Sequence, residues 1–305
     1  MSLLHALVLG ITQGLAEFLP ISSSGHLRLV PWLFGWDDFA GRPDLELAFD
    51  VSLHIGTLAG AIAYFRNDLA RLTRGGLVTL RSRRRGALVG TTETSVAPAP
   101  AGAGGTGGGS PLDPLDDGRL AWLLLASAVP AAITGALLSN AVAELGEAEW
   151  TIGVLLVVFG LVLLWADRLG GTKDAGDFGL RQAAVMGAAQ ALALAPGVSR
   201  SGATITAGRW LGFSRDTAAR LSFLMSLPIT GGAVLYEVSG LLRDEGVPEG
   251  FGGAQAIGIA ASAVTGWFAV WGTLHLVRSR TFRPFVVYRV VVGVGVILLA
   301  ATGLR

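Results

Sequence analysis

Two short segments of this sequence repeat each other and place polar residues in apolar surroundings. The first runs from Gly10 to His26 and the second from Gly187 to Ala203, at a constant offset of 177 residues. The differences that bear on chemistry are Glu17, Ser23 and His26 in the first copy, which stand opposite Leu194, Arg200 and Ala203 in the second. One copy therefore carries a carboxylate, a hydroxyl and an imidazole, and the other carries a cation.

These side chains suit the transfer of a phosphoryl group. Arg200 lies at the predicted N-terminus of a helix, where backbone N–H groups and the helix dipole already favour an anion, and its guanidinium matches phosphate oxygens. Glu17 follows Gln13 by about one helical turn, so both project from one face, and Glu17 could bind a divalent cation or act as a base. His26 could pass a proton to a leaving group or to water. Phosphoryl transfer depends mostly on positioning and charge neutralisation, which this set supplies.

Each of these residues also has a structural explanation. Glu17 could lie near the membrane interface and extend its carboxylate to water. Arg200 could serve only to pair with Glu17, although a buried ion pair is a costly way to gain stability. One serine of the run 22–24 is expected to cap the following helix. Asp50 and His54, one turn apart, leave three interpretations open: a proton relay, a metal site or an interhelical hydrogen bond.

The composition is that of a polytopic membrane protein rather than a soluble domain. Of the 305 residues, 51% are apolar and 15% are charged, and the mean hydropathy is +0.58. The absence of cysteine excludes disulfides and thiolate metal sites, and the N-terminus lacks the features of a cleaved signal peptide. We expect an all-α fold with about six transmembrane helices. The stretches that are apolar and long enough to cross the bilayer are 46–65, 120–143, 150–166, 217–236, 252–277 and 285–304.

The two repeated segments do not fit as simple spans, because each is broken near its middle. Pro20 interrupts the stretch 3–35, and Pro196 interrupts the stretch 182–212. Each stretch is therefore predicted to be a re-entrant pair of helices that reverses at membrane depth, in a place where protein or a wet cavity satisfies its backbone. Three spans separate the copies, and an odd number makes them inverted-topology repeats.

The duplication extends beyond the two broken segments. Residues 47–53 align with residues 221–227 at an offset of 174. We expect a single membrane domain in which repeat one covers 1–167 and repeat two covers 180–305. Residues 86–118 are mostly Gly, Ala, Pro, Ser and Thr, a composition typical of a flexible linker.

The distribution of charge orients the chain. Arginines accumulate between Arg66 and Arg85, and by the positive-inside rule this loop and the linker after it are cytoplasmic. The first broken segment then enters the membrane from outside and the second enters from inside. Two helix N-termini are expected to meet near the membrane centre around a pseudo-two-fold axis, one bringing Ser23 and the other Arg200.

At this point the sequence resembles a known family, the bacitracin-resistance type undecaprenyl-diphosphate phosphatases of bacterial envelope lipid recycling. The family pattern Glu/Gln-x-x-x-Glu followed by Phe-Leu-Pro-x-Ser-Ser-x-Gly-His matches Gln13 to His26, and its pattern Pro-Gly-x-Ser-Arg-Ser-Gly-Ala-Thr matches Pro196 to Thr204. The similarity covers nearly the whole chain apart from the linker. One departure is Gln13, which stands where many members have a first carboxylate.

The resemblance implies an activity, a location and a set of site residues. It implies hydrolysis of undecaprenyl diphosphate to undecaprenyl phosphate and inorganic phosphate, which recycles the carrier for peptidoglycan synthesis and confers bacitracin resistance. It implies a multi-pass protein of the bacterial cytoplasmic (inner) membrane, with the site facing the extracytoplasmic side, and a polyprenyl diphosphate as partner; nucleic acid is not expected and a homodimer is left open. A divalent cation, Mg or Ca, is expected on Glu17 and Gln13. The catalytic set is Glu17, Ser23, His26 and Arg200, and the phosphate-binding set is Ser22, Ser24, Ser199, Ser201 and Thr204.

Two mechanisms and a second function remain open at this stage. In the first mechanism Ser23 attacks the terminal phosphorus, Arg200 holds its oxygens, His26 is the acid/base and Glu17 orients the cation. In the second, metal-bound water attacks directly. The other function is transport of a polyprenyl phosphate, because broken helices that meet at the midplane are a transporter plan. The asymmetry between the copies favours hydrolysis, since a carrier needs only an anion clamp.

Overall fold

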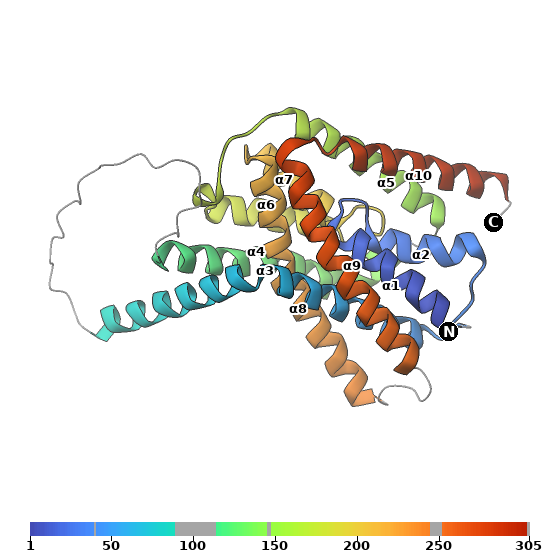
Figure 1. Ribbon diagram of the computed structural model, residues 1–305, viewed down its shortest axis with the longest axis horizontal. Coiled ribbons are helices and arrows are strands. Elements are labelled where there is room, and N and C mark those ends of the chain that lie inside the picture. The colour runs from blue at the N-terminus through green and yellow to red at the C-terminus, as the bar shows by residue number, and fades with distance from the viewer. Residues whose placement is uncertain (40, 89–113, 145–147, 245–251, 304–305) are drawn as a thin grey trace.

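The structure is a computed structural model of the 305-residue chain, and it describes all residues except 40, 89–113, 145–147, 245–251 and 304–305. The described residues form an elongated bundle of helices (Figure 1). Six helices are long and apolar enough to cross a membrane. They are α3 (Pro43–Leu88), α4 (Pro114–Glu144), α5 (Glu149–Arg168), α8 (Arg215–Asp244), α9 (Gly252–Ser279) and α10 (Arg283–Thr302). The predicted all-α polytopic fold with six spans is confirmed.

The first broken segment is a helical hairpin, α1 (Leu3–Phe18) followed by α2 (Ser23–Phe34). The chain reverses between the two helices within four residues that include Pro20. At the open end of the hairpin, the imidazole of His5 lies 2.7 Å from the Asp38 carboxylate and stacks on Trp36. The start of α1 and the end of α2 are therefore tied together at one end of the bundle.

The second broken segment has the same form. It consists of α6 (Leu180–Leu192) and α7 (Arg200–Trp210), preceded by the short 3₁₀ helix η1 (Ala175–Asp177). Lys173 and Phe213 form an isolated β-bridge, and the Lys173 ammonium donates to the Leu211 carbonyl at 2.8 Å. This bridge ties the end of α7 to the segment before α6, just as Asp38 ties the ends of the first hairpin.

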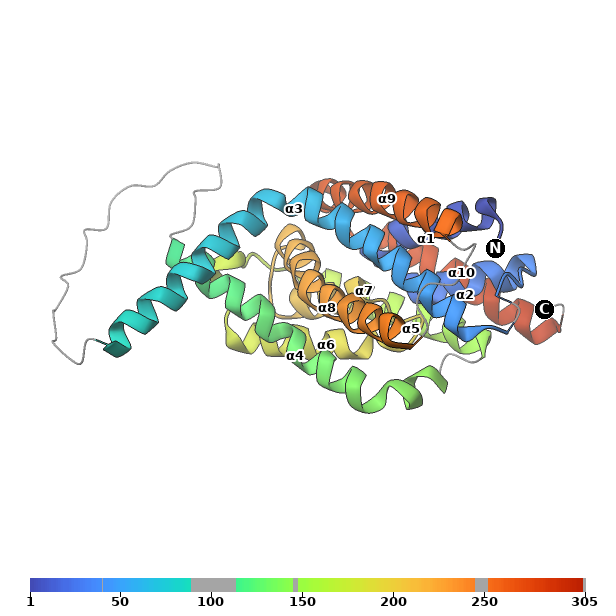
Figure 2. The same ribbon diagram turned by 90° about the horizontal axis from the view of Figure 1, so that it is seen from below.

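The two hairpins enter the bundle from opposite ends, since α3, α4 and α5 separate them in the chain. Figure 1 shows α1 and α2 running inward from the end at which both chain termini lie. The packing partners exchange accordingly: α1 lies against α9, α6 lies against α4, and α5 packs on α10 (Figure 2). Helices at equivalent positions of inverted repeats would pair in this way. The boundaries at 1–167 and 180–305 stay a prediction.

The predicted linker at 86–118 is too long at both ends. Residues 86–88 complete α3, and α4 already begins at Pro114. The start of α4 has a proline and two acidic residues in its first turn, which favour a helix N-terminus, and Asp117 forms an ion pair with Arg71 of α3 at 3.1 Å. The remaining part, 89–113, lies outside the described residues.

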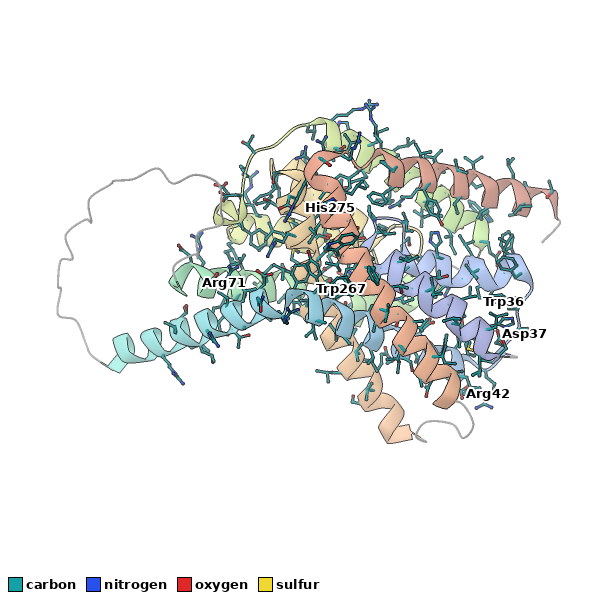
Figure 3. All side chains as sticks on the ribbon, viewed as in Figure 1. Trp36, Asp37, Arg42, Arg71, Trp267 and His275 are labelled. Carbon is teal, nitrogen blue, oxygen red and sulfur yellow. The ribbon has the colours of Figure 1, made fainter. Side chains whose placement is uncertain are left out.

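Ion pairs between helices gather at the end opposite the chain termini. Arg220 of α8 makes two 2.7 Å hydrogen bonds to Asp68 of α3, and Arg215 donates to the buried Asp167 of α5 at 2.5 Å. Figure 3 places Arg71 toward this end, whereas Trp36, Asp37 and Arg42 lie at the other. The arginine-rich segment that begins at Arg66, which the sequence analysis assigned to the cytoplasmic side, therefore lies at this end of the bundle.

Glycines let α3 and α9 approach closely, and this contact is testable. A Cβ added at Gly60 would overlap the carbonyl oxygen of Ala263, which is backbone and cannot turn away, whereas a Cβ at Gly272 of α9 would meet nothing within 4 Å. We expect Gly60→Ala to lower the free energy of unfolding by about 1–3 kcal/mol, as overpacking does. Thermal unfolding of the detergent-purified protein measures this. Gly272→Ala is the control, and equal melting temperatures for the two variants would contradict the helix contact.

Candidate active site

Ser22 and Ser199 immediately precede α2 and α7, the second helices of the two hairpins, and they share an unusual backbone conformation. Their φ angles are +79° and +72°, and within the described residues they are the only non-glycine residues with positive φ. Each Oγ accepts a hydrogen bond from the N–H three residues later, at Gly25 and Gly202. Both serines are therefore helix N-caps in a left-handed conformation, which is a strained arrangement for a residue with a Cβ. The repeat seen in the sequence is a repeat of local geometry.

Hydrogen bonds run directly from one reversal to the other. The Gly197 N–H donates to Ser22 Oγ at 3.0 Å, and Ser201 Oγ donates to the Leu19 carbonyl at 3.0 Å. Each hairpin thus satisfies a backbone group that the break in the other hairpin leaves open. The two breaks are held face to face in the middle of the bundle.

Arg289 of α10 binds both breaks at once. Its side chain is fully buried, and its guanidinium donates to the Pro20 carbonyl in the first break at 3.1 Å. It also donates to the carbonyls of Gly197 and Val198 in the second break, at 2.8 and 3.0 Å. Further bonds go to α5, at the carbonyls of Leu155 and Leu156. A guanidinium presents several donors in one plane, so a single side chain can fix carbonyls from three segments.

The chemically active groups meet at the carboxylate of Glu17, which is only 6% exposed. Its Oε2 accepts hydrogen bonds from Ser23 Oγ at 2.6 Å and from Gln13 Nε2 at 3.1 Å. Its Oε1 is paired with the guanidinium of Arg200 from the other hairpin. The structure therefore brings Glu17, Ser23, Gln13 and Arg200 together, and the ion pair that the sequence left as an alternative is present.

Arg200 is held in place by α8 as well. Its Nη1 bonds to the hydroxyl of Thr230 and to the carbonyl of Ser226. The guanidinium has more N–H donors than these contacts and the Glu17 pair use. Arg200 therefore keeps donors for a phosphate beside the N-terminal amides of α2 and α7, which have no partner within their helices.

His26 lies beside this centre, but the contacts of its ring differ from those expected of a free acid/base. Nδ1 lies 2.7 Å from the Ser22 carbonyl, and Nε2 lies 2.8 Å from the Tyr288 hydroxyl. Because a carbonyl only accepts, Nδ1 carries the hydrogen, and in the neutral ring Nε2 accepts from Tyr288. A proton on His26 would thus be exchanged with the phenol of Tyr288.

The residues predicted to bind phosphate have more structural contacts than expected. Ser22 and Ser199 are caps, Ser201 bridges the breaks, and the fully buried Thr204 hydroxyl bonds to Ser222 of α8 at 2.6 Å. Ser24 is exposed, and its hydroxyl takes no part in the described side-chain hydrogen bonds. As phosphate ligands these five residues stay predictions.

Three residues of the site carried no distinguishing signal in the sequence or only an ambiguous one. Tyr288 and Arg289 stand in an apolar span near the C-terminus, where a tyrosine commonly anchors a helix at the interface. A charged residue inside a span is a signal of function, and Arg289 could have been identified on that ground. His54 of α3, left open above, lies with Nε2 3.9 Å from Glu17 Oε2, while its Nδ1 bonds to the Asp50 carbonyl. Asp50 therefore contributes its backbone to this contact.

The role of Arg289 in joining the breaks can be measured. Arg289→Lys keeps the charge but cannot reach carbonyls of all three segments, so buried acceptors lose their donors. We expect the free energy of unfolding to fall by about 3 kcal/mol. Thermal unfolding in detergent would show this, with Arg283→Lys, an exposed position on the same helix, as the control. An unchanged melting temperature in Arg289→Lys would mean that the two breaks are held together without the Arg289 guanidinium.

Comparison with known proteins identifies the family of the chain. The family model described as "Bacitracin resistance protein BacA" matches residues 6–295. A curated undecaprenyl-diphosphatase of Geobacter metallireducens is 45% identical over 300 residues, which cover 98% of each chain. Those of Geobacter sulfurreducens and Pelobacter propionicus are 44% and 42% identical, over 96% and 100% of this chain and 96% and 99% of their own. The chain thus belongs to the bacitracin resistance protein BacA family.

Proposed function

We propose that this protein hydrolyses undecaprenyl diphosphate to undecaprenyl phosphate and inorganic phosphate. The observation that carries the proposal is the meeting of Glu17 and Ser23 from one hairpin with Arg200 from the other. Relatives of this length and identity are named for that reaction. A carrier of lipid phosphate would need the cation but not a hydroxyl bonded to a carboxylate, so hydrolysis explains more of the site than transport does.

The contacts of Ser23 suggest how the reaction proceeds. Ser23 Oγ attacks the terminal phosphorus, its proton passes to Glu17 Oε2, and the bond to the bridging oxygen breaks, so that undecaprenyl phosphate leaves. Arg200 and the amides at the starts of α2 and α7 hold the charged oxygens. Glu17 passes the proton that it took from Ser23 to the departing undecaprenyl phosphate. Water then attacks the phosphoserine, one of its protons returns to Ser23 as the bond between phosphorus and Ser23 Oγ breaks, and inorganic phosphate is released. Glu17, rather than His26, takes the role of base in this scheme.

A divalent cation fits the part of the site that Glu17 and Gln13 form. Gln13 is fully buried and its Oε1 has no hydrogen-bond partner among the described residues, although its amide lies against the Glu17 carboxylate. An orphaned buried oxygen beside a carboxylate is a donor set that Mg or Ca accepts. Glu17 and Gln13 would hold the ion. When bound, it would neutralise part of the charge of the diphosphate.

The placement of the two hairpins supports a proposal for the direction from which the lipid arrives. The arginine-rich end of the bundle would face the cytoplasm of a bacterial inner membrane. The first hairpin, which carries Glu17 and Ser23, enters from the opposite end. The reaction would then be open to the extracytoplasmic side, where released carrier becomes available for reuse, and faster recycling would account for bacitracin resistance.

Loss of Arg200 should remove most of the activity. We expect Arg200→Ala to lower the rate of phosphate release from undecaprenyl diphosphate by about 10²–10³-fold, because one preformed donor to a developing oxyanion contributes that much. Phosphate release by purified protein with and without EDTA measures both the residue and the cation requirement. Arg283→Ala, which removes an exposed arginine outside the site, should retain the parent rate. A folded parent protein that releases no phosphate with any cation would refute hydrolysis.

The covalent route and direct attack by water give different results at Ser23. If Ser23 is the nucleophile, rapid acid quench with ³²P-labelled substrate traps a phosphoserine, and Ser23→Ala loses at least about 10³-fold in rate. Mass spectrometry of the tryptic peptide locates the phosphate. If no label is trapped and Ser23→Ala remains active, water is the attacking group and Ser23 only binds substrate.

A further inference from the structure

His54 has the geometry of a metal ligand, although it lies outside both repeated segments. Its Nδ1 is 2.8 Å from the Asp50 carbonyl of the preceding turn of α3. A carbonyl cannot donate, so Nδ1 carries the hydrogen and Nε2 of the neutral ring has an open lone pair. Histidines that bind metals are usually fixed in this way, with the second ring nitrogen donating to a backbone carbonyl. The tautomer is therefore set before any ligand arrives.

His54 Nε2 lies near the carboxylate at the centre of the site. Nε2 lies 3.9 Å from Glu17 Oε2, which is too long for a hydrogen bond. Two ligands that are each about 2.1 Å from one ion stand up to about 4.2 Å apart. The separation therefore suits two ligands that are bridged by a single cation.

Gln13 could supply a third ligand beside the same carboxylate oxygen. Its Nε2 donates to Glu17 Oε2 at 3.1 Å, and its Oε1 is the buried acceptor that lacks a partner among the described residues. A half-turn of the amide exchanges these two atoms. It would satisfy the orphaned oxygen and open one lone pair of Oε2, while the 2.6 Å bond from Ser23 to the same oxygen is kept.

We propose that His54 Nε2 is a ligand of the divalent cation, together with Glu17 and Gln13. The proposal rests on the proposed function for the cation requirement and adds a ligand to it. Glu17 would face the cation with Oε2 and the Arg200 guanidinium with Oε1, so both positive groups would converge on one diphosphate. Among the described residues no three His, Cys, Asp or Glu side chains gather as a metal cluster. The proposed site has only two ligands of these types, and its third ligand is the Gln13 amide.

This ligand set also accounts for the missing carboxylate at position 13. An amide oxygen contributes less charge than a carboxylate, and a neutral imidazole adds a ligand without adding charge. Ca²⁺ takes oxygen ligands, whereas imidazole nitrogen is a ligand of first-row transition metals, the group to which Mn²⁺ belongs. The site should therefore bind Mn²⁺ more tightly than Ca²⁺, and Gln13→Glu should strengthen binding of both ions.

The test is Mn²⁺ binding to the full chain in detergent, with the histidines labelled by ¹⁵N and no lipid present. Pulsed electron paramagnetic resonance reports a nitrogen directly bonded to Mn²⁺. We expect this ¹⁵N signal in the parent protein and its loss in His54→Ala, with affinity for Mn²⁺ at least about 10-fold weaker, since even partners one bond further from a metal contribute that much. His275→Ala is the matched control, because His275 stacks on Trp271 of α9 and has no part in the site.

Each outcome decides the proposal. It is overturned if the parent protein gives no histidine signal with bound Mn²⁺, or if His54→Ala keeps both signal and affinity. Should His54→Ala fail to fold, His54→Gln, which keeps a polar side chain of similar length, must lose the signal. Because binding is measured without substrate, phosphate release can fail while the Mn²⁺ result stands, so the two proposals are separated.

Discussion

A helix that is broken inside a membrane exposes carbonyl and N–H groups that no water can reach, and in this protein one guanidinium satisfies three of these carbonyls. Arg289 bonds to Pro20 in one break and to Gly197 and Val198 in the other. Without this side chain each break would carry unsatisfied acceptors, which cost free energy in a low-dielectric interior. The meeting of the two hairpins, and with it the site, depends on that interaction.

The same interaction has an electrostatic effect on the site. The described hydrogen bonds of Arg289 all go to carbonyl oxygens, so its charge is solvated by dipoles and is not cancelled by a carboxylate. It lies beside the N-termini of α2 and α7, where the helix dipoles are also positive. Arg200 adds a further cation, which Glu17 balances in the absence of substrate. The centre of the bundle thus has the positive charge to bind an anion that carries several negative charges, and the Glu17 carboxylate supplies the base.

Much of this was readable from the sequence because apolar length and internal repetition are local signals. The spans, the two reversals, one serine cap within 22–24 and the meeting of the two broken segments follow from the pattern and from the parity of the spans. The cap at Ser199 was not predicted, and the pairing of Glu17 with Arg200 was one of two alternatives. The contacts of Tyr288 and Arg289 were missed, because a residue in a C-terminal span gives no sign that its partner lies some 260 positions earlier. Thr204 fits a phosphate motif and stays a predicted ligand, but its hydrogen bond to Ser222 could not be read from the motif. The linker was overextended because residues 86–88 continue α3 and Pro114, a residue that favours the first turn of a helix, already begins α4.

The opposed hairpins restrict how the length of this chain can change. Glu17 and Arg200 meet only because α3, α4 and α5 return the chain to the far side before the second hairpin begins. A single added or deleted span would reverse that hairpin and carry Arg200 away from the carboxylate. Insertions that keep the site intact are therefore confined to pairs of spans or to the connections between them. Growth between α3 and α4 meets this condition, since it leaves every later helix with its orientation unchanged.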